Sequence, residues 1–234
     1  MNAADRKTAD TYYEAGLKAF ESKDVKNAFA LFLAAADKGN ADAQFRVGVF
    51  YYNGIVVPRN EIEAFKWYRK AAQQNHPAAM SELGIMYAEG KKTQRSPAKA
   101  FEWTCRAAET GHPQAICNLA SFYRKGVGVE PNPVIAVRLY EEAADKKVPE
   151  ACYALAHLCY DGEGTRQDRS RAARLCRKAA DLGHPQAAFN TGRLYHEGDG
   201  VEKDDDLALK YFRMALNMGI REAFPFIKEI ENGA

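Results

Sequence analysis

The sequence has no long apolar segment, no excess of one charge and no cysteine framework. No apolar run reaches the roughly 20 residues of a transmembrane helix or resembles a signal peptide. The 33 basic residues balance 31 acidic ones, so the net charge of +2 indicates neither nucleic acid nor a membrane surface. The five cysteines lack zinc or disulfide spacing. Unpaired thiols favour a reducing compartment, so we expect a cytoplasmic protein; a periplasmic or secreted one is the alternative if Met1 replaces a removed signal peptide.

A period of 36 residues dominates the chain. The glycines at this step are Gly54, Gly90, Gly126, Gly162 and Gly198. Alanines keep the same period at Ala43, Ala79, Ala115, Ala151 and Ala187, and at Ala64, Ala100, Ala136, Ala172 and Ala208. Five blocks therefore tile the sequence, at 41–76, 77–112, 113–148, 149–184 and 185–220. A fixed period in this range is typical of stacked supersecondary units.

Each block is expected to fold as two helices. In block 77–112, Leu83 and Tyr87 belong to one helical face, and Gly90 ends that helix because glycine adopts the left-handed conformation at little cost. Ser96 before Pro97 is a strong start signal for the second helix. Its counterparts in the other blocks are Asn60, Asn132, Asp168 and Asp204. A small residue recurs in each first helix, where we expect two helices to approach closely: Gly48, Gly84, Ala120, Ala156 and Gly192.

Two motifs in these blocks resemble those of the Sel-one-like repeat family, a branch of the tetratricopeptide superfamily. Ala79, Leu83, Gly84, Tyr87 and Gly90 carry the first motif, and Ala172, Ala179, Ala180, Gly183, His184 and Pro185 carry the second. The resemblance implies an all-α, right-handed superhelical solenoid and a role as an adaptor. The disulfide staples of the cysteine-rich branch are absent, because alanines stand at the first position of each staple.

We expect a single solenoid domain over 1–234. Segment 1–40 resembles an ordinary tetratricopeptide repeat because its inter-helix loop is four residues shorter, with Asp24 as N-cap and Gly39 as the stop. The five blocks are the Sel-one-like repeats. The polar segment 221–234 is predicted to be a closing helix, which a solenoid needs to cover its last apolar face.

Several motifs suggest chemistry but have simpler interpretations. Ser96 and Lys99 match the S-x-x-K of penicillin-interacting enzymes, but the partner motifs are missing and Ser96 occupies the cap position. The paired glycines after each first helix lack the sequence of a phosphate loop. His76, His112 and His184 fall at equivalent positions of stacked repeats, on the order of 10 Å or more apart, so we interpret them as linker residues and not as metal ligands.

The resemblance places a binding groove along the first helices, which line the concave surface of tetratricopeptide superhelices. Its aromatic end comprises Tyr13, Phe20, Phe45 and Tyr52. Its cationic end, which also carries tyrosines, comprises Arg124, Lys125, Tyr153, His157, Tyr160, Arg193 and His196. Two alternatives remain open. The aromatic rings could pack on one another as scaffold, and Glu150, Asp161 and Glu197 are close enough in register to pair with the cations.

We expect a non-enzymatic adaptor that holds a peptide or partner segment in this groove. The cationic end would then meet acidic side chains or a C-terminal carboxylate. The alternatives are a β-lactam or cell-wall hydrolase of the cysteine-rich type, for which no set of nucleophile, base and orienting residue can be assembled, and an exported bacterial host-interaction or envelope-stress factor. We expect no cofactor, no metal, no nucleic-acid partner and no membrane insertion.

Overall fold

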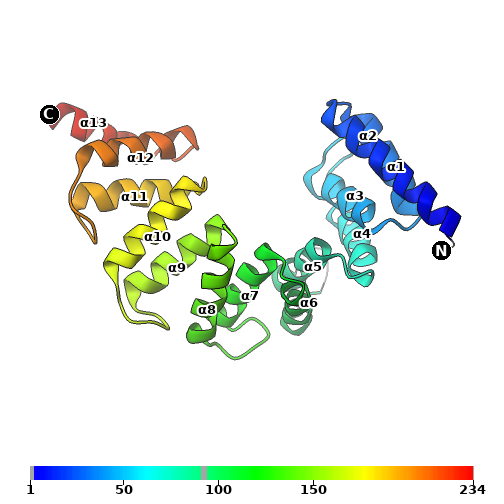
Figure 1. Cartoon of the computed structure of the whole chain (residues 1–234), viewed down its shortest axis with the longest axis horizontal. Helices are drawn as coiled ribbons and strands as arrows, with labels where there is room; N and C mark the ends of the chain where they lie inside the picture. Colours follow the sequence, from blue (N-terminus) through cyan, green and yellow to red (C-terminus); the bar gives the residue numbers. More distant parts are fainter. Residues whose placement is uncertain (1–2, 91–93, 234) are drawn as a thin grey trace. The chain divides into compact units, whose positions relative to one another are not determined.

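The computed structural model describes residues 3–90 and 94–233, which form thirteen helices and no strand (Figure 1). The first pair is α1 (Ala3–Glu21) and α2 (Val25–Asp37). The repeated blocks supply α3 (Ala41–Asn53) with α4 (Glu61–Gln73), α5 (Pro77–Glu89) with α6 (Pro97–Glu109), α7 (Pro113–Lys125) with α8 (Pro133–Asp145), α9 (Pro149–Asp161) with α10 (Arg169–Asp181), and α11 (Pro185–Glu197) with α12 (Asp205–Asn217). The last helix is α13 (Ala223–Gly233). The expectation of an all-α repeat fold is confirmed.

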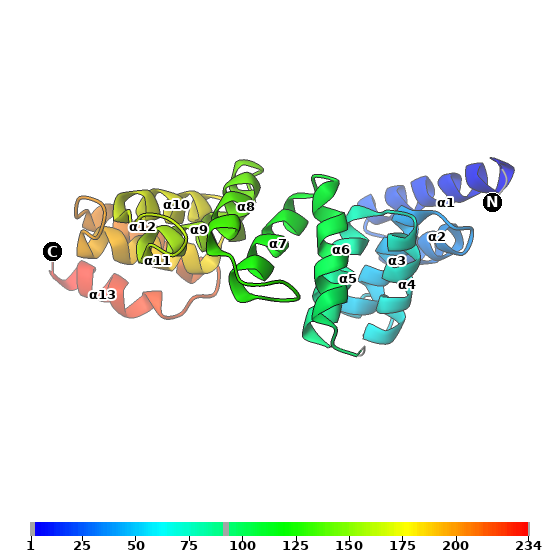
Figure 2. The same ribbon diagram turned by 90° about the horizontal axis from the view of Figure 1, so that it is seen from below.

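The helices group into two compact units. One comprises Met1–Asn118 and Val127–Val129, and the other comprises Leu119–Gly126 and Glu130–Ala234. Consecutive helices contact one another from α1 to α6 in the first unit and from α8 to α13 in the second. Figure 2 shows α3 to α6 packed side by side, and likewise α9 to α12. These stacked pairs form a helical repeat solenoid, while the single-domain organisation and the right-handed superhelix stay predictions.

The predicted caps are confirmed at the starts of the second helices. A side-chain oxygen accepts a bond from a free backbone N–H of the first turn, which offsets the lack of an intrahelical partner there. The residues that do so are Asp24, Asn60, Ser96, Asn132, Asp168 and Asp204. Four first helices end at a left-handed glycine with φ between 69° and 75°: Gly54, Gly90, Gly162 and Gly198.

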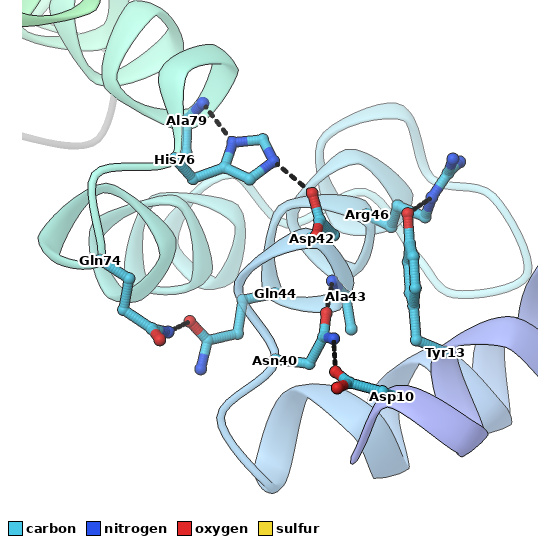
Figure 3. Close-up of polar contacts among 10 residues, drawn as sticks. All are labelled: Asp10, Tyr13, Asn40, Asp42, Ala43, Gln44, Arg46, Gln74, His76 and Ala79. Carbon is cyan, nitrogen blue, oxygen red and sulfur yellow. Dashed lines mark hydrogen bonds and ion pairs between the residues drawn. The ribbon is translucent and has the colours of Figure 1, made fainter. Parts of the chain in front are cut away.

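Histidines cap first helices, a role that the linker interpretation missed. The Nδ1 of His76 accepts the backbone N–H of Ala79 at 3.2 Å (Figure 3). His112 and His184 make the same bond at the starts of α7 and α11. Because the accepting nitrogen must be unprotonated, each cap requires a neutral ring. Burial lowers the pKa of all three histidines and favours that neutral form.

The small residues of the first helices permit close approach to the second helices, as expected. A Cβ on Gly48 would lie 2.5 Å from the Tyr68 ring. A Cβ on Gly84 would lie 2.1 Å from Oγ1 of Thr104. Neither separation is compatible with van der Waals contact, so each glycine fixes how closely its two helices pack.

The closing helix is confirmed, at Ala223–Gly233 within the predicted 221–234 segment. It packs on α12 and buries one apolar face, which includes Ile227 and Ile230. The Phe226 ring stacks on Phe212 with 5.0 Å between centroids. Exposed Lys228 and Glu229 are on the outside of the helix. The apolar face of the last repeat is therefore covered by an amphipathic helix with a polar outer surface.

Candidate functional site

Hydrogen bonds connect neighbouring first helices at one register. The Tyr13 hydroxyl in α1 accepts from Nε of Arg46 in α3 at 3.1 Å, as Figure 3 shows. In the same register, Asn118 in α7 donates to Ser81 in α5 at 3.1 Å. A third bond of this type joins α11 to α9, from the Asn190 amide to the hydroxyl of Tyr153, at 3.0 Å. First helices of successive repeats therefore lie side by side within each unit.

The aromatic residues predicted for the groove pack mainly on their own scaffold. The Tyr13 ring lies 5.8 Å from that of Phe32, and Phe45 stacks on His76 at 4.8 Å. The Tyr52 ring lies beneath the guanidinium of Arg59, 5.5 Å from its centroid. These three rings therefore pack into the scaffold, on partners other than one another in these contacts.

Phe20 differs from the other predicted aromatics because its side chain is exposed. It retains 43% of its accessible surface and touches Phe50 only edge-on, at 6.3 Å. Phe20 therefore offers more aromatic surface to a partner than Tyr13, Phe45 and Tyr52, which are half-buried.

The predicted cations are largely neutralised by carboxylates of the same chain. Arg124 binds Glu163 in the loop after α9 through three contacts of 2.8 to 3.1 Å. Within α11, Arg193 pairs with Glu197 one turn later at 2.9 Å, as the register suggested.

His196 and Lys125 complete the predicted cationic set. His196 contacts Asp205 at the start of α12, with 2.6 Å between Nδ1 and the carboxylate. This contact lowers the pKa of the Asp205 carboxyl, mainly through the hydrogen bond. The Lys125 side chain is exposed at the end of α7.

A pocket of about 290 Å³ lies between α9 and α11, over α10, inside the second unit. It brings together four of the predicted residues: Tyr153, His157, Tyr160 and Arg193. The remaining lining residues are Ala156, Asp161, Ala172, Cys176, Asn190, Leu194, Glu197 and Asp199. This volume is near the lower end of small-molecule sites, and it suits one long side chain.

The pocket lies where the second helix of its repeat carries a thiol at a position that is aromatic in most other repeats. At the position of Cys176, four other repeats carry a buried aromatic residue: Phe32, Tyr68, Tyr140 and Phe212. Where such a ring is present it covers the first helix of its own repeat, as Phe212 covers Gly192. Cys176 is 4% exposed at the pocket floor, and its sulfur contacts Thr191 and the carbonyl of Ala187, both at 3.5 Å. A thiol fills less space than a ring, so the gap between α9 and α11 stays open.

The thiols are mostly buried, and no disulfide joins them among the described residues. Cys159 and Cys176 fall where other repeats place large apolar residues, a position that predicts burial, and both are buried. Cys105 is the most accessible of the five, and burial together with the charge of Glu109 raises its pKa to about 11. From the sequence we expect Cys105 and Cys117 to be the most exposed thiols; this is wrong for Cys117, which is buried. Its helix position is directed inward, as Phe45 shows by packing on Tyr68 at 5.6 Å.

Other features bear on enzyme and membrane hypotheses. Ser96 accepts the backbone N–H of Lys99, so the S-x-x-K match is an N-cap. No group of three or more potential ligands that could hold a metal ion occurs in the described part of the chain. Among the helices formed by residues 3–90 and 94–233, none combines the length and apolarity needed to cross a membrane.

Comparison with known proteins places the chain in a family. The model of the Sel1 repeat matches residues 3–40, 41–76, 77–112, 113–148, 149–184 and 185–220. These matches cover nearly the whole sequence, including the segment with the shorter loop. No curated protein matches the chain.

Solved structures support the same assignment. A protective antigen of uropathogenic Escherichia coli that displays an SLR fold is 29% identical over 96% of this chain, with a TM-score of 0.80. A Sel1 repeat protein from Oxalobacter formigenes is 27% identical over 95%, with a TM-score of 0.83. This chain covers 49% of the first protein and 66% of the second. An immunity protein of Pseudomonas aeruginosa, 18% identical over 91% of this chain and 83% of its own, shares the fold at a TM-score of 0.62. The chain belongs to the Sel1 repeat family, a family of repeat scaffolds.

Proposed function

We propose that this protein is a non-catalytic scaffold that binds a segment of another protein along its first helices. The observation that carries the proposal is the pocket between α9 and α11, which is bounded by two neighbouring first helices. Peptide segments bind to helical repeats by placing side chains between such helices.

The preference of the scaffold for acidic partners is weaker than the sequence alone suggests. Arg124, Arg193 and His196 each contact a carboxylate of the same chain. An acidic ligand would have to compete with those carboxylates, and exposed pairs of this type act through screened attraction. Partner binding at the first helices therefore forms the core of the proposal, and an acidic segment stays a prediction.

Site-specific photocrosslinking tests which face of the scaffold binds. A benzophenone amino acid is placed at Phe20, Lys125 or Arg193, which are exposed on first helices. The matched control positions are Lys66, Glu142 and Arg174, which are exposed on second helices. After irradiation in native lysate, we expect a discrete adduct from the first-helix positions. Adducts from the control positions alone would refute the proposal, because the partner would then contact the outer surface.

A further inference from the structure

The pocket between α9 and α11 is negatively charged at one end. Asp161 and Glu197 are the last residues of α9 and α11, and Asp199 follows two residues after α11. The three carboxylates therefore gather at the end of the pocket where both helices terminate. Helix C-termini also carry partial negative charge on their unpaired carbonyls. Helix ends and side chains thus give this end of the pocket the same sign.

Carboxylates outnumber cations around the pocket. Arg193 is the one arginine or lysine in its lining and already pairs with Glu197 at 2.9 Å. Arg169, at the start of α10, pairs with Asp199 at 3.0 Å from the rim. With both guanidinium groups counted, one carboxylate charge remains in excess. A further anion in this space would meet repulsion, and a cation would be attracted.

The rim already binds a guanidinium group of its own chain. Arg169 lies 5.1 Å from the centroid of the Tyr160 ring while it pairs with Asp199. Further inside, the pocket is lined by two more rings. Tyr153 and His157 are in edge-to-face contact at 4.6 Å, and Glu197 also lines the space. Aromatic faces next to carboxylates suit ammonium and guanidinium groups.

The floor of the pocket suits the stem of a long side chain. Ala156 and Ala172 are small, and Leu194 and Cys176 complete an apolar surface between the polar groups. Lysine and arginine side chains bury their methylene stems on such surfaces and keep the charged head among polar groups. The pocket therefore matches a basic side chain in charge, shape and volume.

We propose that this pocket receives a lysine or arginine side chain of the bound partner segment, with the charged head among Asp161, Glu197 and Asp199. This inference rests on the proposed scaffold function and names the recognition chemistry at one of its repeats. The stem lies over Cys176, where other repeats carry a ring. The predicted acidic preference is thereby reversed for this repeat.

Filling the pocket tests the inference directly. The variant Cys176→Phe restores the ring of Phe32 and Phe212 at this position. Repeat 113–148 shows that such a ring is compatible with alanine in the first helix, because Ala120 and Tyr140 are both buried there. The variant is therefore expected to fold, with a helical circular dichroism spectrum and a thermal midpoint no lower than that of the wild type.

The probes are N-acetyl-lysine methylamide, N-acetyl-arginine methylamide and N-acetyl-glutamate methylamide, titrated into the full chain by nuclear magnetic resonance. We expect the basic probes to shift pocket amides, including those of Tyr153, Asn190 and Glu197, more strongly than the glutamate probe. Cys176→Phe should weaken the basic probes by about tenfold or more, because the ring occupies their space. Equal or stronger binding of the glutamate probe, or no saturable shift with any probe, overturns the inference.

Two charge variants give opposite predictions and do not depend on Cys176→Phe. Glu197→Gln should weaken the lysine probe about two- to fivefold, the range of an exposed ion pair. Arg193→Gln should strengthen it by about twofold or more, because Glu197 is released from its partner. The matched control is Glu142→Gln, an exposed carboxylate on α8, and it should change nothing. Weaker binding in Arg193→Gln would instead indicate an anion site.

These outcomes separate the inference from the scaffold proposal. Crosslinking from first-helix positions that persists unchanged in Cys176→Phe, with no response to the basic probes, would refute the pocket and leave the scaffold intact. Probe binding to the pocket together with crosslinks only from second helices would refute the scaffold proposal and the partner role of the pocket.

Discussion

The close contact between Gly84 and Thr104 predicts how substitutions at these two residues change the free energy of unfolding. A Cβ on Gly84 would lie 2.1 Å from Oγ1 of Thr104 and 3.2 Å from the carbonyl oxygen of Ala100. Oγ1 is buried and has no hydrogen-bond partner among the described residues. The hydroxyl therefore acts as a steric wall without gaining a bond. Gly84→Ala tests that wall with the smallest possible side chain.

Two effects oppose each other in Gly84→Ala. Replacing glycine by alanine inside a helix stabilises by about 1 kcal/mol. Overpacking a core contact costs about 1–3 kcal/mol. In a Thr104→Ala background the contact of 2.1 Å with Oγ1 is gone, although the Ala100 carbonyl oxygen still lies 3.2 Å from the new Cβ, so most of the overpacking cost should disappear. The helix term cancels in a double-mutant cycle, and the coupling energy between the two sites should be about 1–3 kcal/mol. Gly84→Leu, which adds more atoms at the same place, should destabilise the wild type by at least this amount.

Urea denaturation followed by circular dichroism measures the four free energies of unfolding. Thr104→Val is the matched control, because its methyl group keeps the wall where the hydroxyl stood. The coupling of Gly84→Ala with Thr104→Val should therefore be close to zero. Thr104→Val alone should stabilise by about 1 kcal/mol, since it removes a buried hydroxyl without a partner. An additive cycle with Thr104→Ala, within about 0.5 kcal/mol, would show that the close contact does not limit packing.

Two further predictions concern titration and thiols. Burial lowers the folded-state pKa of His76, His112 and His184 below the ordinary 6.5, so the unfolded chain binds more protons. Their contribution to stability should be complete above about pH 6.5 and be lost as the pH falls towards the folded-state pKa. Replacing all three with Asn, a cap that does not titrate, should reduce the change in thermal midpoint between about pH 7.5 and pH 5. Ellman titration without reductant should detect all five thiols after denaturation. In the folded chain, Cys105 should react before the other four, and it should react slowly because its pKa is raised.

Local features of the fold could be predicted from the sequence. An N-cap such as Asn60 and a C-terminal glycine such as Gly90 act on the backbone of their own turn, so the residue type indicates the geometry. The histidine caps were missed because histidine is not among the preferred N-cap residues. The regular placement of three histidines before proline was the available signal, since Pro is favoured at the first helical position.

The candidate site was less predictable because its contacts join different repeats. Glu197 is four residues from Arg193 in one helix, and this pair was anticipated. Glu163 is 39 residues from Arg124 in a loop, so no local rule connects them. The Tyr160 hydroxyl donates a hydrogen bond to Asp199, which is again 39 residues away. Such contacts depend on how one repeat is rotated against the next, which the period alone does not determine.

Two repeats lack an aromatic residue at the second-helix position of Phe212, and they carry Thr104 and Cys176 there. Thr104 packs against Gly84 so closely that no Cβ fits between them, and the helices meet directly. Cys176 is opposite Ala156, and the space beside them remains open as a pocket. The loss of a ring therefore produces a tight contact in one repeat and a cavity in the other. An unfilled space costs stability, and four repeats of this chain fill the same position with a ring, so we interpret the open space beside Cys176 as a binding feature of this repeat.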